Sequence, residues 1–162
     1  EIWKFLMLLW YAYRKKEFDE PFDGIVYAVM VGMGFATVEN ISYVSQYGLM
    51  TGIMRLFLAV PAHASFAIIM GYFMGKARFS AKKQHFLLFF GVFWATVFHG
   101  SYDFFLFLQE SHTTGTDNAS LLMFLGAMVS LVTGIILSKK AIKEHLKLSV
   151  LQNTNEYNVE DN

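Results

Sequence analysis

A carboxylate inside an apolar stretch long enough to cross a membrane is the feature that most constrains this chain. Residues 24–44 form a nearly continuous apolar run, and Glu39 lies well inside it. A helix needs about 20 residues, at about 1.5 Å each, to cross a hydrocarbon core about 30 Å thick. A charge at the centre of a bilayer costs at least about 2.5 kcal/mol, so such residues usually face a cavity or a partner. We therefore expect the other helices to bring partners to Glu39.

The composition also indicates a protein embedded in a membrane. Of the 162 residues, 55% are hydrophobic and 16% are charged, against about 45–50% and about 25% in soluble domains. The formal net charge is zero and the basic residues lie in short clusters, so we expect no nucleic-acid partner. Because the chain has no cysteine, a bound metal would have to be held by His, Asp or Glu.

The apolar pattern predicts an all-α fold, a polytopic transmembrane helix bundle with four complete spans and one truncated N-terminal span. The complete spans are predicted at residues 24–46, 58–76, 86–108 and 120–138. The apolar run 2–13 is too short to cross, and 47–57 is predicted to be an interfacial segment. Residues 1–151 are expected to form a single transmembrane domain, and the polar segment 152–162 a disordered cytoplasmic tail.

The basic residues predict the orientation, because short loops rich in Lys and Arg favour the cytoplasmic side. Segments 14–16, 76–83 and 139–147 hold nearly all of them and follow alternate sides of successive spans. Arg55 is the only basic residue in the loops on the opposite side. We therefore expect a multi-pass protein of the cell membrane with a cytoplasmic C-terminus.

Four ionisable residues on four predicted helices lie at one depth. Counted at 1.5 Å per residue from the cytoplasmic ends, they are Glu39 at about 22 Å, His63 and His99 at about 20 Å, and Glu1 at about 19 Å. Their imidazoles and carboxylates could hold a tetrahedral metal with an open position, or could orient a water directly, and either arrangement would make a nucleophile. The predicted metal ligands are Glu39, His63 and His99, with zinc as the candidate metal.

Three further residues could support these four. Asp103 follows His99 by four residues and shares its helix face, so it could join the site or only orient that imidazole. Lys4 lies one turn from Glu1 and is predicted to be its charge partner. Asn40 could be an oxyanion donor or a tie between helices, and the second is favoured.

Four ordered motifs resemble those of the PrsW family of intramembrane proteases. Residues 1–4 (Glu-Ile-Trp-Lys) resemble the end of its Glu-Glu-x-x-Lys motif, and 35–40 (Phe-Ala-Thr-Val-Glu-Asn) resemble its Phe-x-x-x-Glu-Asn motif. Residues 61–63 (Pro-Ala-His) and 99–103 (His-Gly-Ser-Tyr-Asp) resemble its two His motifs. The resemblance covers nearly all of the chain as far as Phe79 and resumes around His99.

The resemblance implies an intramembrane metalloprotease, related to CAAX prenyl endopeptidases, with catalytic residues Glu1, Glu39, His63 and His99. It implies that the substrate is a single-span membrane protein, such as an anti-sigma factor, cut near the extracytoplasmic surface as the first step of a signalling cascade. The first Glu of the family's paired motif would precede Glu1, so we expect a chain without it to be inactive. The expected partners are this transmembrane substrate and the lipid bilayer.

Two other functions stay open. Intramembrane Glu, His and Asp also build proton relays and transporters, but a relay should distribute its residues through the depth of the membrane, whereas these lie at one level. A non-catalytic scaffold that binds transmembrane helices is the stronger alternative, because the loss of one carboxylate or of the metal would convert an enzyme into such a scaffold.

Overall fold

The computed structural model describes residues 1–111 and 118–160, and within those ranges the chain is helical, without a strand. The elements, in chain order, are α1 (Ile2–Met7), the π-helical turn η1 (Leu8–Ala12), α2 (Asp23–Tyr47), α3 (Leu49–Phe57), α4 (Ala59–Arg78), α5 (Gln84–Ser111) and α6 (Asn118–Glu160). The prediction of an all-α fold is confirmed.

The number of membrane spans differs from the prediction. In the described chain, α2 and the Ala119–Leu151 part of α6 are each long and apolar enough to cross a membrane, and α3 with α4 qualify only as a pair bent by 42°. Two spans, or three with the bent pair, replace the four that we predicted, and that prediction is wrong. Helix α5 is long enough at 28 residues, but His99 and Asp103 interrupt its apolar run. The N-terminal helix Ile2–Ala12 is too short to cross, as predicted.

Pro61 gives a physical reason for the bend between α3 and α4. A proline ring clashes with the carbonyl of the residue four positions earlier, which here is Phe57, the last residue of α3. The helix breaks at Leu58 and resumes with Pro61 in the first turn of α4. The segment that we predicted to be interfacial is therefore a helix that leads directly into α4.

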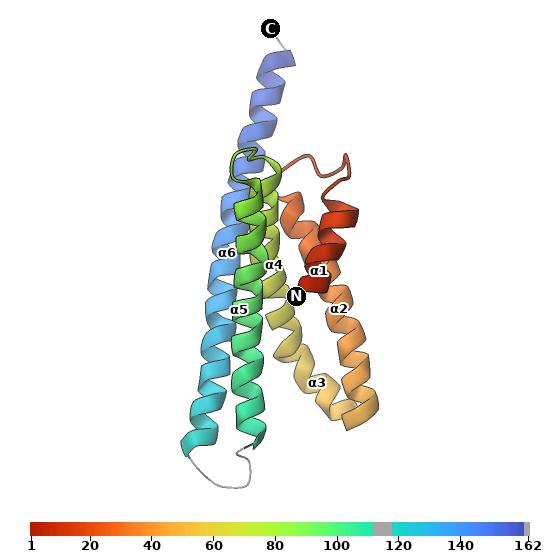
Figure 1. Ribbon diagram of the computed structural model, residues 1–162, viewed down its shortest axis with the longest axis vertical. Coiled ribbons are helices and arrows are strands. Elements are labelled where there is room, and N and C mark those ends of the chain that lie inside the picture. Colours follow the sequence, from red (N-terminus) through yellow and green to blue (C-terminus); the bar gives the residue numbers. More distant parts are fainter. Residues whose placement is uncertain (112–117, 161–162) are drawn as a thin grey trace.

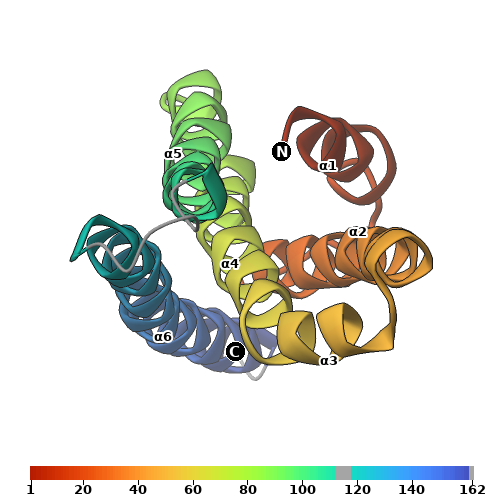
Figure 2. The same cartoon turned by 90° about the horizontal axis from the view of Figure 1, so that it is seen from below.

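Figure 1 shows α2, α4, α5 and α6 running along the long axis, with α1 beside α2 and α3 returning obliquely from the far end of α2 to α4. The connections before α2 and before α5 lie at the upper end of this view. A salt bridge between Lys76 and Glu144 places the basic part of α6 at the same end. Seen from below, α4 lies centrally, with α2, α5 and α6 around it (Figure 2).

Glycines bring α2 and α4 into backbone contact near this upper end. A Cβ atom added to Gly24 would lie 2.6 Å from the backbone nitrogen of Gly75, and one added to Gly71 would lie 2.7 Å from the Cβ of Ala28. Neither position can accept a side chain unless a backbone moves, which is the small-residue packing typical of membrane helices. This contact fixes the register in which Glu39 of α2 meets His63 of α4.

Helix α6 continues to Glu160, through most of the segment for which we expected a disordered tail. Neither Gly nor Pro follows Gly134 in the sequence, so the chain lacks the residues that most strongly end a helix. The domain boundaries at residues 1–151 stay a prediction.

Candidate functional site

Seven polar side chains from α1 to α5 form one continuous series of contacts. In order, the contacts are Arg55 Nη2 to Glu39 Oε2 (2.5 Å), Glu39 Oε2 to His63 Nε2 (2.8 Å), His63 Nδ1 to Lys4 Nζ (3.3 Å), Lys4 Nζ to Glu1 Oε1 (2.6 Å), Glu1 Oε1 to His99 Nδ1 (2.6 Å) and His99 Nε2 to Asp103 Oδ2 (3.3 Å). The N-terminus, which bears Glu1, lies near mid-height of the bundle (Figure 1). The four residues predicted to share one depth lie in this one cluster.

Glu1, His63 and His99 form the group that could hold a metal. Each offers one ligand atom, and these atoms all lie within 4.8 Å of one another. The second oxygen of Glu1, Oε2, is buried without a hydrogen-bond partner among the described residues. A buried carboxylate oxygen with an unused lone pair beside two imidazoles fits a divalent metal such as zinc. The carboxylate in this group is that of Glu1, whereas our predicted ligand set contained Glu39, which instead contacts His63 Nε2.

Lys4 fixes the protonation pattern of His63. An ammonium group only donates, so Nδ1 of His63 must accept from Lys4, and Nε2 then carries the proton that it donates to Glu39. The side chains of Lys4 and Glu1 are each only 4% exposed, and the ammonium also lies 4.7 Å from the centre of the Phe35 ring. Lys4 therefore places one positive charge between the carboxylate and the imidazole of the candidate metal group.

His99 lies between two carboxylates, because its Nδ1 faces Glu1 and its Nε2 faces Asp103. A neutral imidazole can donate to only one of them, whereas an imidazolium can donate to both. The ring meets that of His63 edge to face, with centroids 4.7 Å apart, and lies 5.6 Å from that of the fully buried Phe66. Packing and hydrogen bonds together fix the orientation of this imidazole.

Asn40 stands apart from the series of contacts. Its Oδ1 is buried without a hydrogen-bond partner among the described residues. Its Nδ2 lies 3.7 Å from the position that a Cβ atom on Gly52 of α3 would take. The amide thus faces α3, and its role as a tie between helices stays a prediction.

A cavity of about 220 Å³ borders the cluster. Its charged and imidazole lining residues are Glu39, Arg55, His63, His99 and Asp103, and the others are Tyr43, Ala59, Ala62, Tyr102, Leu106 and Phe107. A water occupies about 30 Å³ of liquid volume, so the cavity has room for several waters or for part of an extended peptide. Its lining therefore combines ionisable side chains with aromatic and apolar ones.

The sequence profile of the PrsW family intramembrane metalloproteases matches residues 1–144 of this chain. The chain belongs to the PrsW family. The resemblance inferred from the four motifs is therefore confirmed, and the matched range contains every residue of the contact series.

Named PrsW relatives agree with this assignment. The chain is 43% identical over 110 residues to Protease PrsW of Geobacillus kaustophilus (strain HTA426), an alignment covering 68% of this chain and 49% of that relative. It is 43% identical over 110 residues to Protease PrsW of Bacillus subtilis (strain 168), covering 64% and 48%. The chain thus spans about half the length of the curated relatives that it matches. No solved structure matches it significantly.

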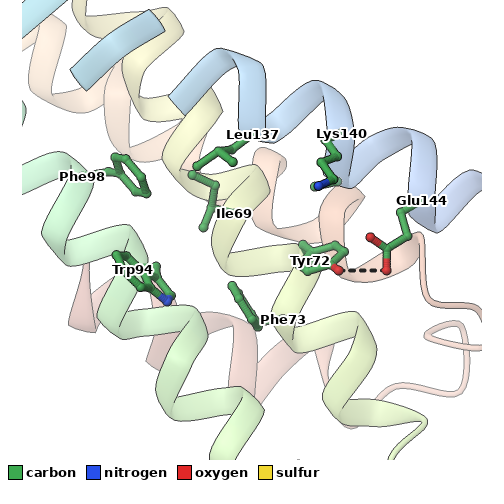
Figure 3. A pocket seen from close by; sticks show the side chains of 9 residues that line it. Ile69, Tyr72, Phe73, Trp94, Phe98, Leu137, Lys140 and Glu144 are labelled. Carbon is green, nitrogen blue, oxygen red and sulfur yellow. Dashed lines mark hydrogen bonds between the residues drawn. The ribbon is translucent and has the colours of Figure 1, made fainter. Parts of the chain in front are cut away.

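A second cavity, of about 390 Å³, lies between α4, α5 and α6 of this PrsW chain. Figure 3 shows the rings of Phe73, Trp94 and Phe98 along it, and Glu144 accepting a hydrogen bond of 2.9 Å from the Tyr72 hydroxyl. It contains no carboxylate–imidazole group among its lining residues. The smaller cavity, rather than the larger one, therefore holds the groups that could hydrolyse a peptide.

Arg55 is the site residue that the sequence did not predict. It was noticed only as the single basic residue on its side of the predicted membrane, yet it donates to Glu39 and its guanidinium carbon lies 3.8 Å from the centre of the Tyr43 ring. An arginine isolated in an apolar segment, eight residues before His63, was the available signal. Its contact with Glu39 depends on the bend at Leu58, which the pattern of apolar residues does not predict.

Proposed function

We propose that this chain carries the hydrolytic centre of an intramembrane endopeptidase, which cuts a single-span membrane protein with a water activated at the Glu/His cluster. The observation that carries the proposal is the convergence of Glu1, His63 and His99 within 4.8 Å, beside a cavity lined by further acids and bases. These residues come from elements far apart in the sequence, and the cluster buries charge that a bundle without a function would have no reason to bury.

Glu39 supplies the proton transfers. Both described hydrogen bonds of Glu39 use Oε2, so Oε1 is the oxygen that would accept a proton from water. Once protonated, Glu39 can give that proton to the leaving amine, because His99, as a candidate metal ligand, has to keep the lone pair of one ring nitrogen. Glu39 thus acts first as base and then as acid on one peptide bond.

The remaining residues of the cluster position these groups. Lys4 neutralises Glu1, and Glu39 selects the tautomer of His63 in which Nδ1 keeps its lone pair. A zinc ion held by Glu1, His63 and His99 would supply Lewis acidity toward water and the peptide carbonyl. Asp103 fixes the orientation of His99.

The proposed substrate is a transmembrane protein resembling an anti-sigma factor, cut near the extracytoplasmic surface. The basic clusters gather at one end of the bundle (Figure 1), which supports a cytoplasmic location for that end and for the C-terminus. Arg55 and the cavity lie farther from this basic end than the Gly24–Gly75 contact does. Because the backbone of an intact helix is hydrogen-bonded, cleavage requires an extended segment, which is easiest to form where a span ends at the interface.

The test uses a full-length protein that contains this sequence, reconstituted in liposomes with a single-span substrate. The wild type should cleave it, and Glu39→Gln should bind it equally well but cleave it at least about 100-fold more slowly, as expected for loss of a general base. Metal content should fall in His63→Ala and stay unchanged in His85→Ala, whose side chain lies outside the cluster. Cleavage by Glu39→Gln at the wild-type rate would refute the proposal.

A non-catalytic scaffold is the second candidate. It is favoured by one observation, the contact of the Lys4 ammonium with both Glu1 and His63, because this contact balances the buried charge without a metal. Substrate binding by the wild-type protein, with no cleavage and no bound metal, would support the scaffold over the enzyme.

A further inference from the structure

We propose that Arg55 binds the carbonyl oxygen of the scissile peptide bond and stabilises the negative charge that forms there during hydrolysis. This role rests on the proposed endopeptidase function and adds to it an electrophilic group outside the four motifs. The inference follows from the position of Arg55, from its unused donors and from the way in which Tyr43 holds its plane.

The position of Arg55 puts a cation into the reaction cavity. It lies in the last turn of α3, two residues before the end of that helix, and it lines the same cavity as Glu39 and His99. Its side chain is 18% exposed, so water screens its charge less than that of a surface arginine. Glu39, which is proposed as base and acid, and Arg55, which is proposed as carbonyl ligand, therefore border one space.

The guanidinium has donors that the folded chain does not use. It carries five N–H groups in one plane, and its described hydrogen bond, from Nη2, goes to Glu39 Oε2. Nε is buried and has no hydrogen-bond partner among the described residues. A buried donor without a partner costs free energy until a ligand accepts its hydrogen bond, so a carbonyl oxygen could be bound without breaking the contact with Glu39.

Tyr43 holds the guanidinium in place. The guanidinium carbon lies 3.8 Å from the centre of the Tyr43 ring, and Tyr43 itself lines the cavity. A donor held by an ion pair on one side and by an aromatic ring on another needs little reorganisation when charge appears. Such fixed donors are the most effective at stabilising a developing oxyanion.

A cation at this position would stabilise the charge that develops during the reaction. When water attacks the carbonyl carbon, the C=O electron pair moves to oxygen and the water proton passes to Glu39, which leaves an oxyanion. When the C–N bond then breaks, the electron pair on the oxyanion returns to form C=O, and the leaving amine takes the proton that Glu39 removed from water. Within the described cavity lining, Arg55 is the side chain with a permanent positive charge, so it borders the space in which the oxyanion would form.

The alternative role is that Arg55 is only the counterion of Glu39. Arg55→Lys separates the two roles, because lysine keeps the charge but not the planar set of donors. If Arg55 is only a counterion, Arg55→Lys should keep nearly full activity. If Arg55 binds the carbonyl oxygen, the kcat of Arg55→Lys should stay low.

The experiment measures kcat and KM for the full-length protein in liposomes with a single-span substrate. Arg55→Ala should lower kcat by about 100- to 1000-fold, the usual effect of removing one oxyanion donor, with KM changed much less. Added guanidinium ion, at concentrations far below those that denature, should restore part of the activity of Arg55→Ala. Guanidinium should not change the activity of Arg55→Lys, because the lysine side chain fills the space that the ion would occupy.

Arg78→Ala is the matched control, because Arg78 also lies over a tyrosine ring, that of Tyr13 at 5.5 Å, but does not line the cavity. Its kcat should stay within about twofold of the wild type, since exposed residues away from a site have small effects. A kcat for Arg55→Ala or Arg55→Lys near that of the wild type would overturn the inference, as would failure of guanidinium to raise the activity of folded Arg55→Ala. An inactive wild-type protein would instead refute the proposed function itself.

Discussion

Replacing Lys4 with methionine should make the stability of the protein depend on zinc. The Lys4 ammonium lies 2.6 Å from Glu1 Oε1, and both side chains are 4% exposed. At an effective dielectric constant of 20, two unit charges at that distance attract by about 6 kcal/mol. Most of this offsets desolvation, and removing one partner of such a buried pair costs about 3–5 kcal/mol. His99 still donates to Glu1, so we expect a loss near the lower value, about 3 kcal/mol.

Zinc should restore much of that loss, because a divalent cation can neutralise Glu1 in place of the ammonium. At a free concentration of 100 times its dissociation constant, a ligand stabilises a protein by about 2.7 kcal/mol. In the wild type the cation must displace Lys4 from Glu1 and His63, so its gain should be smaller. The stability of Lys4→Met should therefore approach that of the wild type only when zinc is present.

The assay is reversible unfolding of the purified full-length protein in mixed micelles, with zinc or with a chelator. Lys16→Met is the control, because Lys16 is exposed and its replacement should change the free energy of unfolding by less than about 0.5 kcal/mol under both conditions. Equal stability of Lys4→Met with zinc and with chelator would refute the reasoning, and so would a larger zinc effect in the wild type.

Three further outcomes can be measured. Gly71→Ala should lower the thermal midpoint, since its Cβ would lie 2.7 Å from that of a neighbouring alanine, whereas Gly34→Ala, with open space around it, should not; equal midpoints would contradict the glycine contact. Asp103→Asn should lower kcat by about 10- to 100-fold through the imidazole that it orients, with little change in metal content, and an unchanged rate would exclude that role. In sealed cells, a membrane-impermeant thiol reagent should label a cysteine at Gln46 and not one at Lys82; the opposite pattern would reverse the proposed orientation.

The rise along a helix predicts a common depth for the site residues, but it does not predict the direction in which each side chain points. A rise of about 1.5 Å per residue fixes depth along a helix, and Glu1, His63 and His99 do meet. Rotation about each helix axis depends on packing, such as the glycine contact between α2 and α4. Depth alone therefore cannot tell which carboxylate meets both imidazoles, and among the described residues Glu1 is the one that forms a group with them.

The number of spans and the role of Arg55 were harder to predict, for two different reasons. The predicted span 86–108 falls short because His99 and Asp103 interrupt the apolar run of α5. The role of Arg55 depends on the bend at Leu58, where a proline three residues later separates two helices that hydropathy alone treats as an interfacial segment and a span. Helices α3 and α4 qualify as a membrane span only when they are taken together as one bent pair. The bend between them brings the end of α3 back to Glu39. Hydropathy along the chain contains no information about such a change of direction.

The glycine contact between α2 and α4 has a mechanical consequence. It begins at Gly24 and continues at Gly32, where an added Cβ atom would lie 2.7 Å from that of Ala67 in α4. Toward the other end the two helices separate and are joined through α3 (Figure 1). Glu39 lies seven residues beyond Gly32, or about 10 Å along the helix. A rotation of about 10° about the contact at Gly32 would therefore displace Glu39 by about 2 Å, enough to break its 2.8 Å hydrogen bond with His63 Nε2. The close packing of the glycines thus sets how accurately the proposed base is held against the imidazole of α4.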